Sequence, residues 1–224
     1  MKKRLITYLF SLLAATCLAQ AQEFQPEWNV GVNGGVTLSQ MRFNPIVSMG
    51  WLQQYAGGLT FRYISEKHWG LQAELNYAMR GWTEKQDSVA WFLNKYSRSL
   101  VYAEVPLMTH FYANLGKHAR FVFLAGPQIS FFVSEKVLEC FRDLESRPRN
   151  NDYDYYDLKV ERFVDYGIVG GAGFELRTGI GHFVLDGRYF FGLSDTFGNV
   201  RTEGDYFEAS GNQVISIKLT YFFK

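Results

Sequence analysis

The chain contains few of the residues that cross-link or interrupt a fold. It has two cysteines, Cys17 and Cys140, among 224 residues. Cys17 lies in a predicted leader segment, so the mature chain keeps a single cysteine and an intramolecular disulfide is excluded. Only five residues are proline, whereas 17% are aromatic and 21 are glycine. This composition favours an all-β protein of one domain that packing and backbone hydrogen bonds stabilise.

Long apolar runs are also missing, apart from one run near the N-terminus. Three cations at positions 2–4 precede an apolar run over residues 5–19, and small residues follow in an A-x-A arrangement that ends at Ala21. The run is shorter than the roughly 20 residues that a membrane-spanning helix needs. We therefore predict that residues 1–21 are a signal peptide and that residues 22–224 form the mature domain. If the mature domain spans a membrane, it does so with strands.

Neither sign of charge is in large excess. The chain has 23 Lys and Arg residues against 22 Asp and Glu residues, and the leader holds three of the cations and no acid. The mature chain therefore carries 20 cations and 22 acids. A basic surface of the kind that binds nucleic acid is not indicated, and we expect no nucleic-acid partner.

Alternating apolar and polar residues are the strongest positive signal. Because successive side chains of a strand point to opposite faces, each alternating segment predicts a strand with one apolar face. None of these apolar faces contains a charged residue. The eight predicted strands cover residues 28–38, 54–64, 69–81, 100–112, 120–133, 164–177, 183–193 and 212–223.

Short and long connections alternate strictly between these strands. The short ones cover residues 65–68, 113–119 and 178–182, and the long ones cover 39–53, 82–99, 134–163 and 194–211. Outer-membrane barrels combine short periplasmic turns with long extracellular loops in this way. We therefore predict an all-β fold, an eight-stranded antiparallel transmembrane β-barrel. A soluble lipocalin-like barrel shares the alternation and is the alternative.

Aromatic residues favour the membrane barrel over the soluble one. Every predicted strand carries an aromatic residue on its apolar face at the end nearest the short connections. Such a ring is typical of a membrane interface, and a soluble carrier does not need it. The residues are Trp28, Tyr63, Trp69, Phe111, Phe121, Phe174, Phe183 and Phe223.

The opposite faces of the strands carry charges of both signs in equal number. Eight strands enclose only enough space for side chains to fill. We predict that these charges pair inside the barrel and close it, since a selective channel would favour one sign. A narrow porin is the alternative. The predicted interior charges are Arg62, Arg80, Arg177, Arg188 and Lys218, with Glu74, Glu104, Asp165, Glu175 and Asp186.

Catalytic and metal-binding patterns are missing from the sequence. All four histidines, at positions 68, 110, 118 and 182, fall at or beside the short turns. Small outer-membrane enzymes generally keep a catalytic histidine at the opposite rim. The histidine spacings match no metal-ligand motif. We predict no catalytic residue, no metal and no cofactor; a small lipid-modifying enzyme or a ligand carrier is the alternative.

Aromatic residues are dense in two of the long loops. Exposed Trp and Tyr residues often dominate binding interfaces, so we predict an interaction surface there. The alternative is a cap folded over the barrel mouth. The acidic residues between the tyrosines do not have the spacing of a calcium-binding loop. The candidate surface consists of Trp91, Phe92, Tyr96, Tyr153, Tyr155 and Tyr156.

Several stretches, in order, carry a family resemblance. They are GLQAELNYAMRG, YAEVPLMTHFY, FLAGPQISFF, DYGIVGGAGFEL and LDGRYFFGLSD. With the aromatic C-terminal strand, they resemble the PorT-like outer-membrane β-barrel family of Bacteroidota over residues 28–223. The resemblance implies a location in the bacterial outer membrane and supplies no catalytic residues.

The resemblance also implies partners. The family's namesake is linked to the type IX secretion system, so secretion-system or other envelope proteins are the implied partners. The closing alternation that ends at Phe223 resembles the signal that barrel-assembly machinery recognises. Outer-membrane lipid and that machinery are therefore further expected partners.

Overall fold

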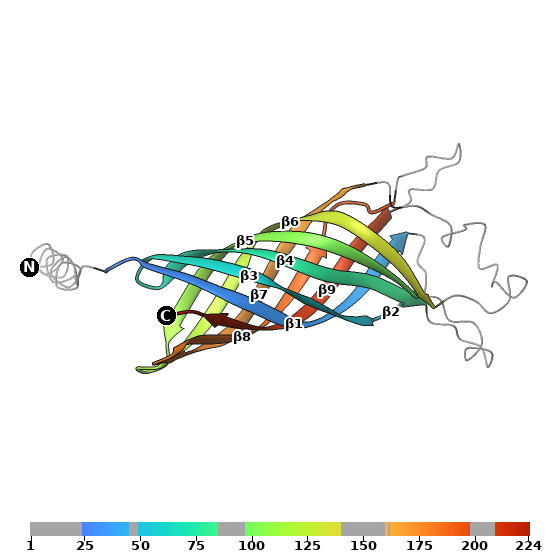
Figure 1. Ribbon diagram of the computed structural model, residues 1–224. Helices are drawn as coiled ribbons and strands as arrows, with labels where there is room; N and C mark the ends of the chain where they lie inside the picture. The colour runs from blue at the N-terminus through green and yellow to red at the C-terminus, as the bar shows by residue number, and fades with distance from the viewer. Residues whose placement is uncertain (1–23, 45–48, 85–96, 140–159, 161, 198–208) are drawn as a thin grey trace, which may run out of the picture.

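The computed structural model describes residues 24–44, 49–84, 97–139, 160, 162–197 and 209–224, and these ranges consist mainly of strands (Figure 1). Within them, no helix has the length and hydropathy needed to cross a membrane. The strands are β1 (Glu27–Asn44), β2 (Met49–Gly50), β3 (Leu52–Glu66), β4 (Trp69–Glu84), β5 (Ser97–Asn114), β6 (Ala119–Glu139), β7 (Val164–Thr178), β8 (Gly181–Gly192) and β9 (Ala209–Phe222).

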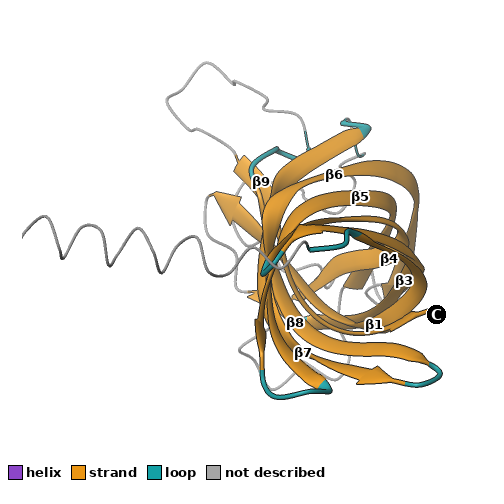
Figure 2. Cartoon of the chain, turned by 90° about the vertical axis from the view of Figure 1, so that its left-hand side faces the viewer, coloured by secondary structure: helices purple, strands orange, loops and turns teal. Residues whose placement is uncertain are grey.

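These strands form one closed antiparallel sheet. Its order is β2-β4-β3-β1-β9-β8-β7-β6-β5, and pairing between β4 and β5 closes the ring. The two residues of β2 pair with the last residues of β4, next to the part of β4 that pairs with β3. Only Trp51 separates β2 from β3 along the chain, so we count β2 and β3 as one strand of the wall. Figure 2 shows the closed ring from the end that carries the short turns. The prediction of an eight-stranded antiparallel barrel is confirmed.

The three short turns lie together at the end of the barrel where the C-terminus lies (Figure 1). The β3–β4 turn contains His68, whose φ of 77° is unusual for a residue with a side chain. Two contacts hold His68 against β5: its Nδ1 lies 2.9 Å from the Tyr112 carbonyl oxygen, and the Tyr112 amide donates to the His68 carbonyl at 3.1 Å. In the β5–β6 turn, Gly116 has a φ of 91°. The predicted short connections are therefore turns.

Strands β1, β3, β4, β5, β6 and β9 extend further toward the long connections than the alternation predicts, whereas β7 and β8 do not. β1 runs to Asn44 instead of 38, and β6 runs to Glu139 instead of 133. In this extension Ser97 of β5 pairs with Glu139, and Asn44 of β1 pairs with Ala209. The backbone ladder continues after the apolar alternation ends, because the alternation reports which residues face an apolar environment and not where hydrogen bonding stops.

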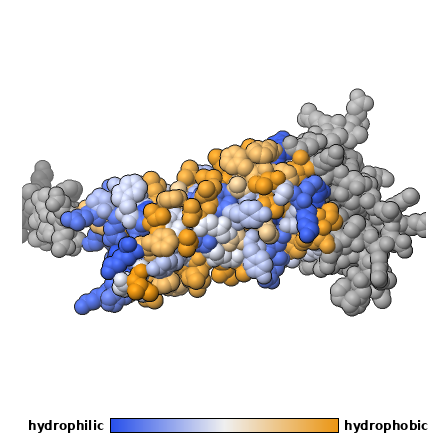
Figure 3. Space-filling model, in the orientation of Figure 1, coloured by the Kyte–Doolittle hydropathy of each residue, from blue (hydrophilic) through white to orange (hydrophobic). Residues whose placement is uncertain are grey.

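The barrel exposes its apolar face and buries its polar one. Leu75, Leu185 and Ile217 are 53%, 54% and 58% exposed, whereas their neighbours Glu74 and Lys218 are buried. Figure 3 shows apolar residues across the middle of the barrel, with polar residues toward its ends. A soluble carrier has the opposite arrangement, because its apolar faces line the interior. The apolar face of this barrel is therefore suited to lipid.

The predicted ring of aromatic residues near the short turns, here called the aromatic girdle, lies on the same outer surface. Trp28 is 79% exposed, and its ring stacks on that of Tyr63 with centroids 4.3 Å apart. Phe121 and Phe174 on neighbouring strands have ring centroids 4.9 Å apart. These rings form the interface belt that the sequence predicts near the short turns.

Apolar side chains fill the lumen at three levels. The cluster nearest the long connections contains Met41, Trp82, Leu100, Tyr102 and Phe197. The middle cluster contains Met108, Leu124, Val169, Phe190 and Val214. The cluster at the short-turn end contains Ile64, Tyr112, Val122, Val184 and Phe222. Charged and amide side chains occupy the space between and beside these clusters.

Candidate functional site

Nine of the ten charges predicted for the interior are buried in the lumen. They are Arg62, Glu74, Arg80, Glu104, Asp165, Glu175, Asp186, Arg188 and Lys218. Arg177 differs from the prediction. It lies at the end of β7 near the short-turn rim, its side chain is 31% exposed, and its Nη2 is 3.3 Å from a carboxylate oxygen of Glu27.

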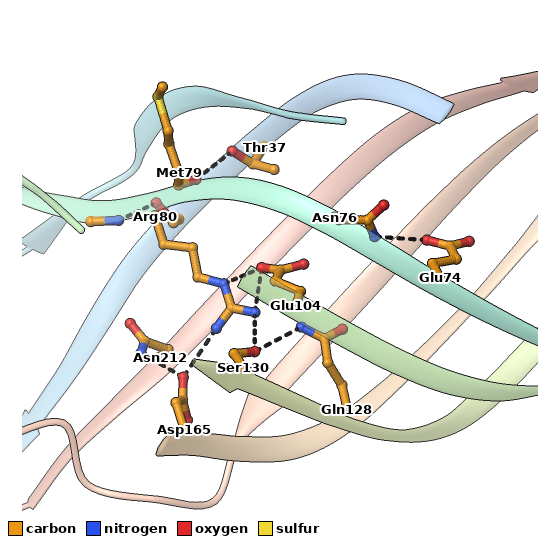
Figure 4. Close-up of polar contacts among 12 residues, drawn as sticks. Thr37, Glu74, Asn76, Met79, Arg80, Glu104, Gln128, Ser130, Asp165 and Asn212 are labelled. Carbon is orange, nitrogen blue, oxygen red and sulfur yellow. Dashed lines mark hydrogen bonds and ion pairs between the residues drawn. The ribbon is translucent and has the colours of Figure 1, made fainter. Parts of the chain in front are cut away.

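The first charge cluster lies toward the long connections and centres on Arg80 of β4. Its Nε donates to Glu104 of β5 at 2.7 Å, and its Nη1 donates to Asp165 of β7 at 3.0 Å. Nη2 donates to Ser130 of β6 at 3.1 Å. Figure 4 shows the guanidinium between these three partners. One side chain therefore ties together four strands of the wall.

Asp165 also anchors the segment of residues 193–197, here called the mouth segment. The Ser194 hydroxyl and the Asn212 amide both donate to Asp165, the second at 2.8 Å. Within the mouth segment, Phe197 is buried in the apolar cluster nearest the long connections. Its backbone amide donates to the Ser210 hydroxyl at 3.0 Å. Ser194 and Phe197 of the mouth segment are therefore buried in the lumen, beside the Arg80 cluster.

The second cluster lies in the middle and centres on Glu74 of β4. Its carboxylate is 2.8 Å from Arg188 Nη1 and 3.4 Å from Lys218 Nζ. It also accepts hydrogen bonds from the amides of Gln72 and Asn76, at 2.8 and 2.9 Å. Arg188 pairs in addition with Asp186 on its own strand. Two cations and two carboxylates thus balance each other in this cluster.

The third cluster lies at the short-turn end and centres on Glu175 of β7. Arg62 of β3 reaches across the lumen and donates to both carboxylate oxygens, at 2.9 and 3.1 Å. Arg120 Nη1 is 4.0 Å from the carboxylate, and His182 Nδ1 is 3.2 Å from it. The Arg62 guanidinium stacks over the Phe222 ring at 4.0 Å. Bidentate pairing of this kind fixes both position and orientation.

Sequence reasoning missed three buried side chains of the lumen, Arg98, Arg120 and His110. Arg120 and His110 fall within predicted strands at inward positions, so the alternation could have identified them. Arg98 pairs with Glu135 and lies two residues before the predicted start of its strand. The assignment of His110 to the short turns is corrected, because this side chain is 1% exposed inside the barrel.

The candidate loop surface lies outside the described residues. This holds for Trp91, Phe92, Tyr96, Tyr153, Tyr155 and Tyr156. Within the part of the chain that the structure describes, no three His, Cys, Asp or Glu side chains are grouped so that they could hold a metal ion.

An apolar exterior with an aromatic girdle and a buried polar interior define an outer-membrane β-barrel protein. The chain belongs to the outer membrane protein β-barrel domain family, whose family model matches residues 20–198. No curated protein sequence is significantly similar to this chain.

Three solved barrels are similar to this chain at low sequence identity. The outer membrane protein OprG from Pseudomonas aeruginosa is 12% identical with a TM-score of 0.50, over 88% of this chain and 95% of that chain. Ail, the attachment invasion locus protein of Yersinia pestis, was solved in complex with the heparin analogue sucrose octasulfate. It is 14% identical with a TM-score of 0.40, over 88% and 99% of the two chains. Neisserial surface protein A is 10% identical with a TM-score of 0.47, over 88% and 99%. The similarity to OprG shows a shared fold.

Proposed function

We propose that this protein is a closed, non-enzymatic barrel that serves as a structural or interaction component of the outer membrane. The observation that carries the proposal is the filled lumen. Three apolar clusters and three charge clusters occupy successive levels of the barrel, and the mouth segment adds Ser194 and Phe197 to this filling near the long connections. A barrel of eight strands has no room for both this filling and an aqueous channel.

The geometry of the ion pairs supports closure over conduction. Arg62 and Glu175 lie on β3 and β7, and Arg80 joins β4 to β7, so these pairs bridge separated parts of the wall. Opening a path would separate buried pairs, and breaking one such pair costs about 3–5 kcal/mol. A resting narrow pore is therefore disfavoured.

The export, membrane insertion and partners that we propose for this protein rest on its sequence. Residues 1–21 act as a cleaved signal peptide, and barrel-assembly machinery inserts the mature domain. The resemblance to the PorT-like family supports an origin in Bacteroidota and a link to type IX secretion. With the lumen filled and the outer wall facing lipid, the long loops are the surface left for protein partners. This assigns the interaction role to Trp91, Tyr155 and their aromatic neighbours.

Two measurements test the proposal. Planar-bilayer recording of the purified protein should show no steady conductance; a stable, defined conductance would contradict closure. Photocrosslinkers at Trp91 and at Tyr155 should capture envelope proteins in intact outer membranes. A crosslinker at Leu75, on the lipid face, is the control and should capture lipid only. Equal protein capture from all three positions would contradict the interaction role.

A further inference from the structure

The two ends of the lumen differ in their charge balance. At the end near the long connections, Arg80 pairs with two carboxylates, those of Glu104 and Asp165. At the short-turn end, two guanidiniums, those of Arg62 and Arg120, share the single carboxylate of Glu175. Among the described luminal residues, the cluster at the short-turn end therefore has one positive charge that no carboxylate neutralises.

Hydrogen bonding compensates the excess charge at the end near the long connections but not at the short-turn end. The extra carboxylate of the Arg80 cluster receives donors, because Asn212 and Ser194 both donate to Asp165. At the short-turn end, Arg120 donates through Nε to Asn114, but its Nη1 has no hydrogen-bond partner among the described residues. Buried polar atoms of native proteins are normally paired, and orphaned ones indicate a missing water or ion.

Several more orphaned atoms lie at this end. Asn29 is opposite Arg62 in the β1–β3 register, and His110 and Arg120 both lie against the Tyr112 ring, at 5.8 and 4.2 Å. His110 is 1% exposed, and neither of its ring nitrogens has a hydrogen-bond partner in the part of the chain that the structure describes. The orphaned atoms of this set are Asn29 Nδ2, Arg62 Nε, His110 Nδ1 and Nε2, Arg120 Nη1 and Thr220 Oγ1. The nitrogens of Asn29, Arg62 and Arg120 in this set can only donate.

We propose that the short-turn end of the lumen binds a small inorganic anion of the chloride type. An anion would accept hydrogen bonds from these donors and would neutralise the second guanidinium. Water alone would satisfy donors but would leave a buried cation uncompensated, which is strongly destabilising. The path from the periplasmic side to this site is short, because Arg120 is the second residue of β6 and His182 is the second residue of β8.

Anion-dependent stability tests the site in solution. The detergent-solubilised protein is heated in sodium chloride–sodium gluconate mixtures of constant ionic strength, and the unfolding midpoint is followed by gel mobility. The midpoint should rise with chloride and then level off, because a ligand that binds only the folded state stabilises it saturably. R120Q should weaken the apparent chloride affinity by about tenfold or more, since it removes a charge-assisted contact.

R177Q is the matched control, because Arg177 is an arginine at the same end that pairs with Glu27 at the exposed rim. It should keep the wild-type response to chloride. H110L removes a ring N–H donor and leaves both arginines in place, so it should also weaken the response, and the test does not depend on R120Q folding. Bromide-soaked crystals of the wild type should show anomalous density between Arg62, His110 and Arg120. A midpoint independent of chloride with no bromide peak, or an equal loss of response in R177Q, would overturn the proposal.

Discussion

Replacing Arg80 by methionine isolates the contribution of a buried charge cluster. The Arg80 side chain is 1% exposed, and its partners Glu104 and Asp165 are 8% and 3% exposed. Methionine is a long apolar side chain that can fill much of the space beside Phe190, whose ring centroid is 4.4 Å from the guanidinium carbon of Arg80. The substitution therefore removes charge and hydrogen bonds more than it removes packing.

The expected cost follows from what Arg80 leaves behind. Removing one partner of a buried pair costs about 3–5 kcal/mol, because the other charge stays buried without compensation. Here two carboxylates lose their cation, so we expect R80M to lower the free energy of unfolding by about 5 kcal/mol, at the upper end of that range. Converting the carboxylates as well, in R80M/E104Q/D165N, should return stability to within about 2 kcal/mol of wild type, because neutral replacement of a whole buried cluster is often tolerated.

Urea titration of folding into lipid vesicles, followed by tryptophan fluorescence, measures these differences. R177M is the control, because its ion pair with Glu27 has both side chains about one-third exposed. An exposed pair contributes about 0–1 kcal/mol, so R177M should resemble wild type. If R80M is no less stable than R177M, or if the triple variant is less stable than R80M, the reasoning about buried charge is wrong.

Two further substitutions test the wall of the barrel. A Cβ at Gly58 would lie 2.0 Å from the Leu75 carbonyl oxygen, whereas a Cβ at Gly187 would meet nothing within 4 Å. G58A should therefore lower the urea midpoint by the equivalent of about 1–3 kcal/mol, and G187A should leave it unchanged; similar midpoints would contradict the close approach of β3 and β4. Leu107 is 52% exposed on the outer face of β5, and Leu115 is 55% exposed in the β5–β6 turn. In the vesicle titration L107R should cost about 2–4 kcal/mol and L115R much less, because only the first puts a cation at mid-bilayer depth; equal costs would count against lipid contact at Leu107.

The outward-facing positions of the barrel wall can be predicted from the sequence, because contact with lipid requires an apolar side chain at every second residue of a strand. Leu75, Leu185 and Ile217 sit at the alternating positions that predict outward faces, and all three are exposed. The strand ends are less readable. Residues 134–139 continue β6 as an extended strand although their side chains no longer alternate between apolar and polar.

The partners within the lumen could not be predicted from the alternation. The alternation of faces along each strand assigns Arg62 and Glu175 to the interior. Their contact, however, depends on the strand tilt and stagger that bring β3 opposite β7. Arg177 also occupies an inward-facing position of the alternation, but its strand ends at the rim, so the side chain contacts Glu27 instead of entering the lumen. His110 shows the converse case, in which nearness to a turn in sequence concealed a fully inward position.

Thiol accessibility inside the lumen tests closure most directly. Ser130 is 0% exposed, and its hydroxyl accepts hydrogen bonds from Arg80 at 3.1 Å and from Gln128 at 3.4 Å. S130C in a C140S background therefore places a small thiol within the Arg80 cluster. N114C, at the exposed short-turn end of β5, is the accessible control. We expect a charged, membrane-impermeant thiol reagent to modify N114C rapidly and to leave S130C unmodified until the protein is unfolded. Modification of S130C in the folded protein at a rate close to that of N114C would contradict a closed, ion-paired lumen.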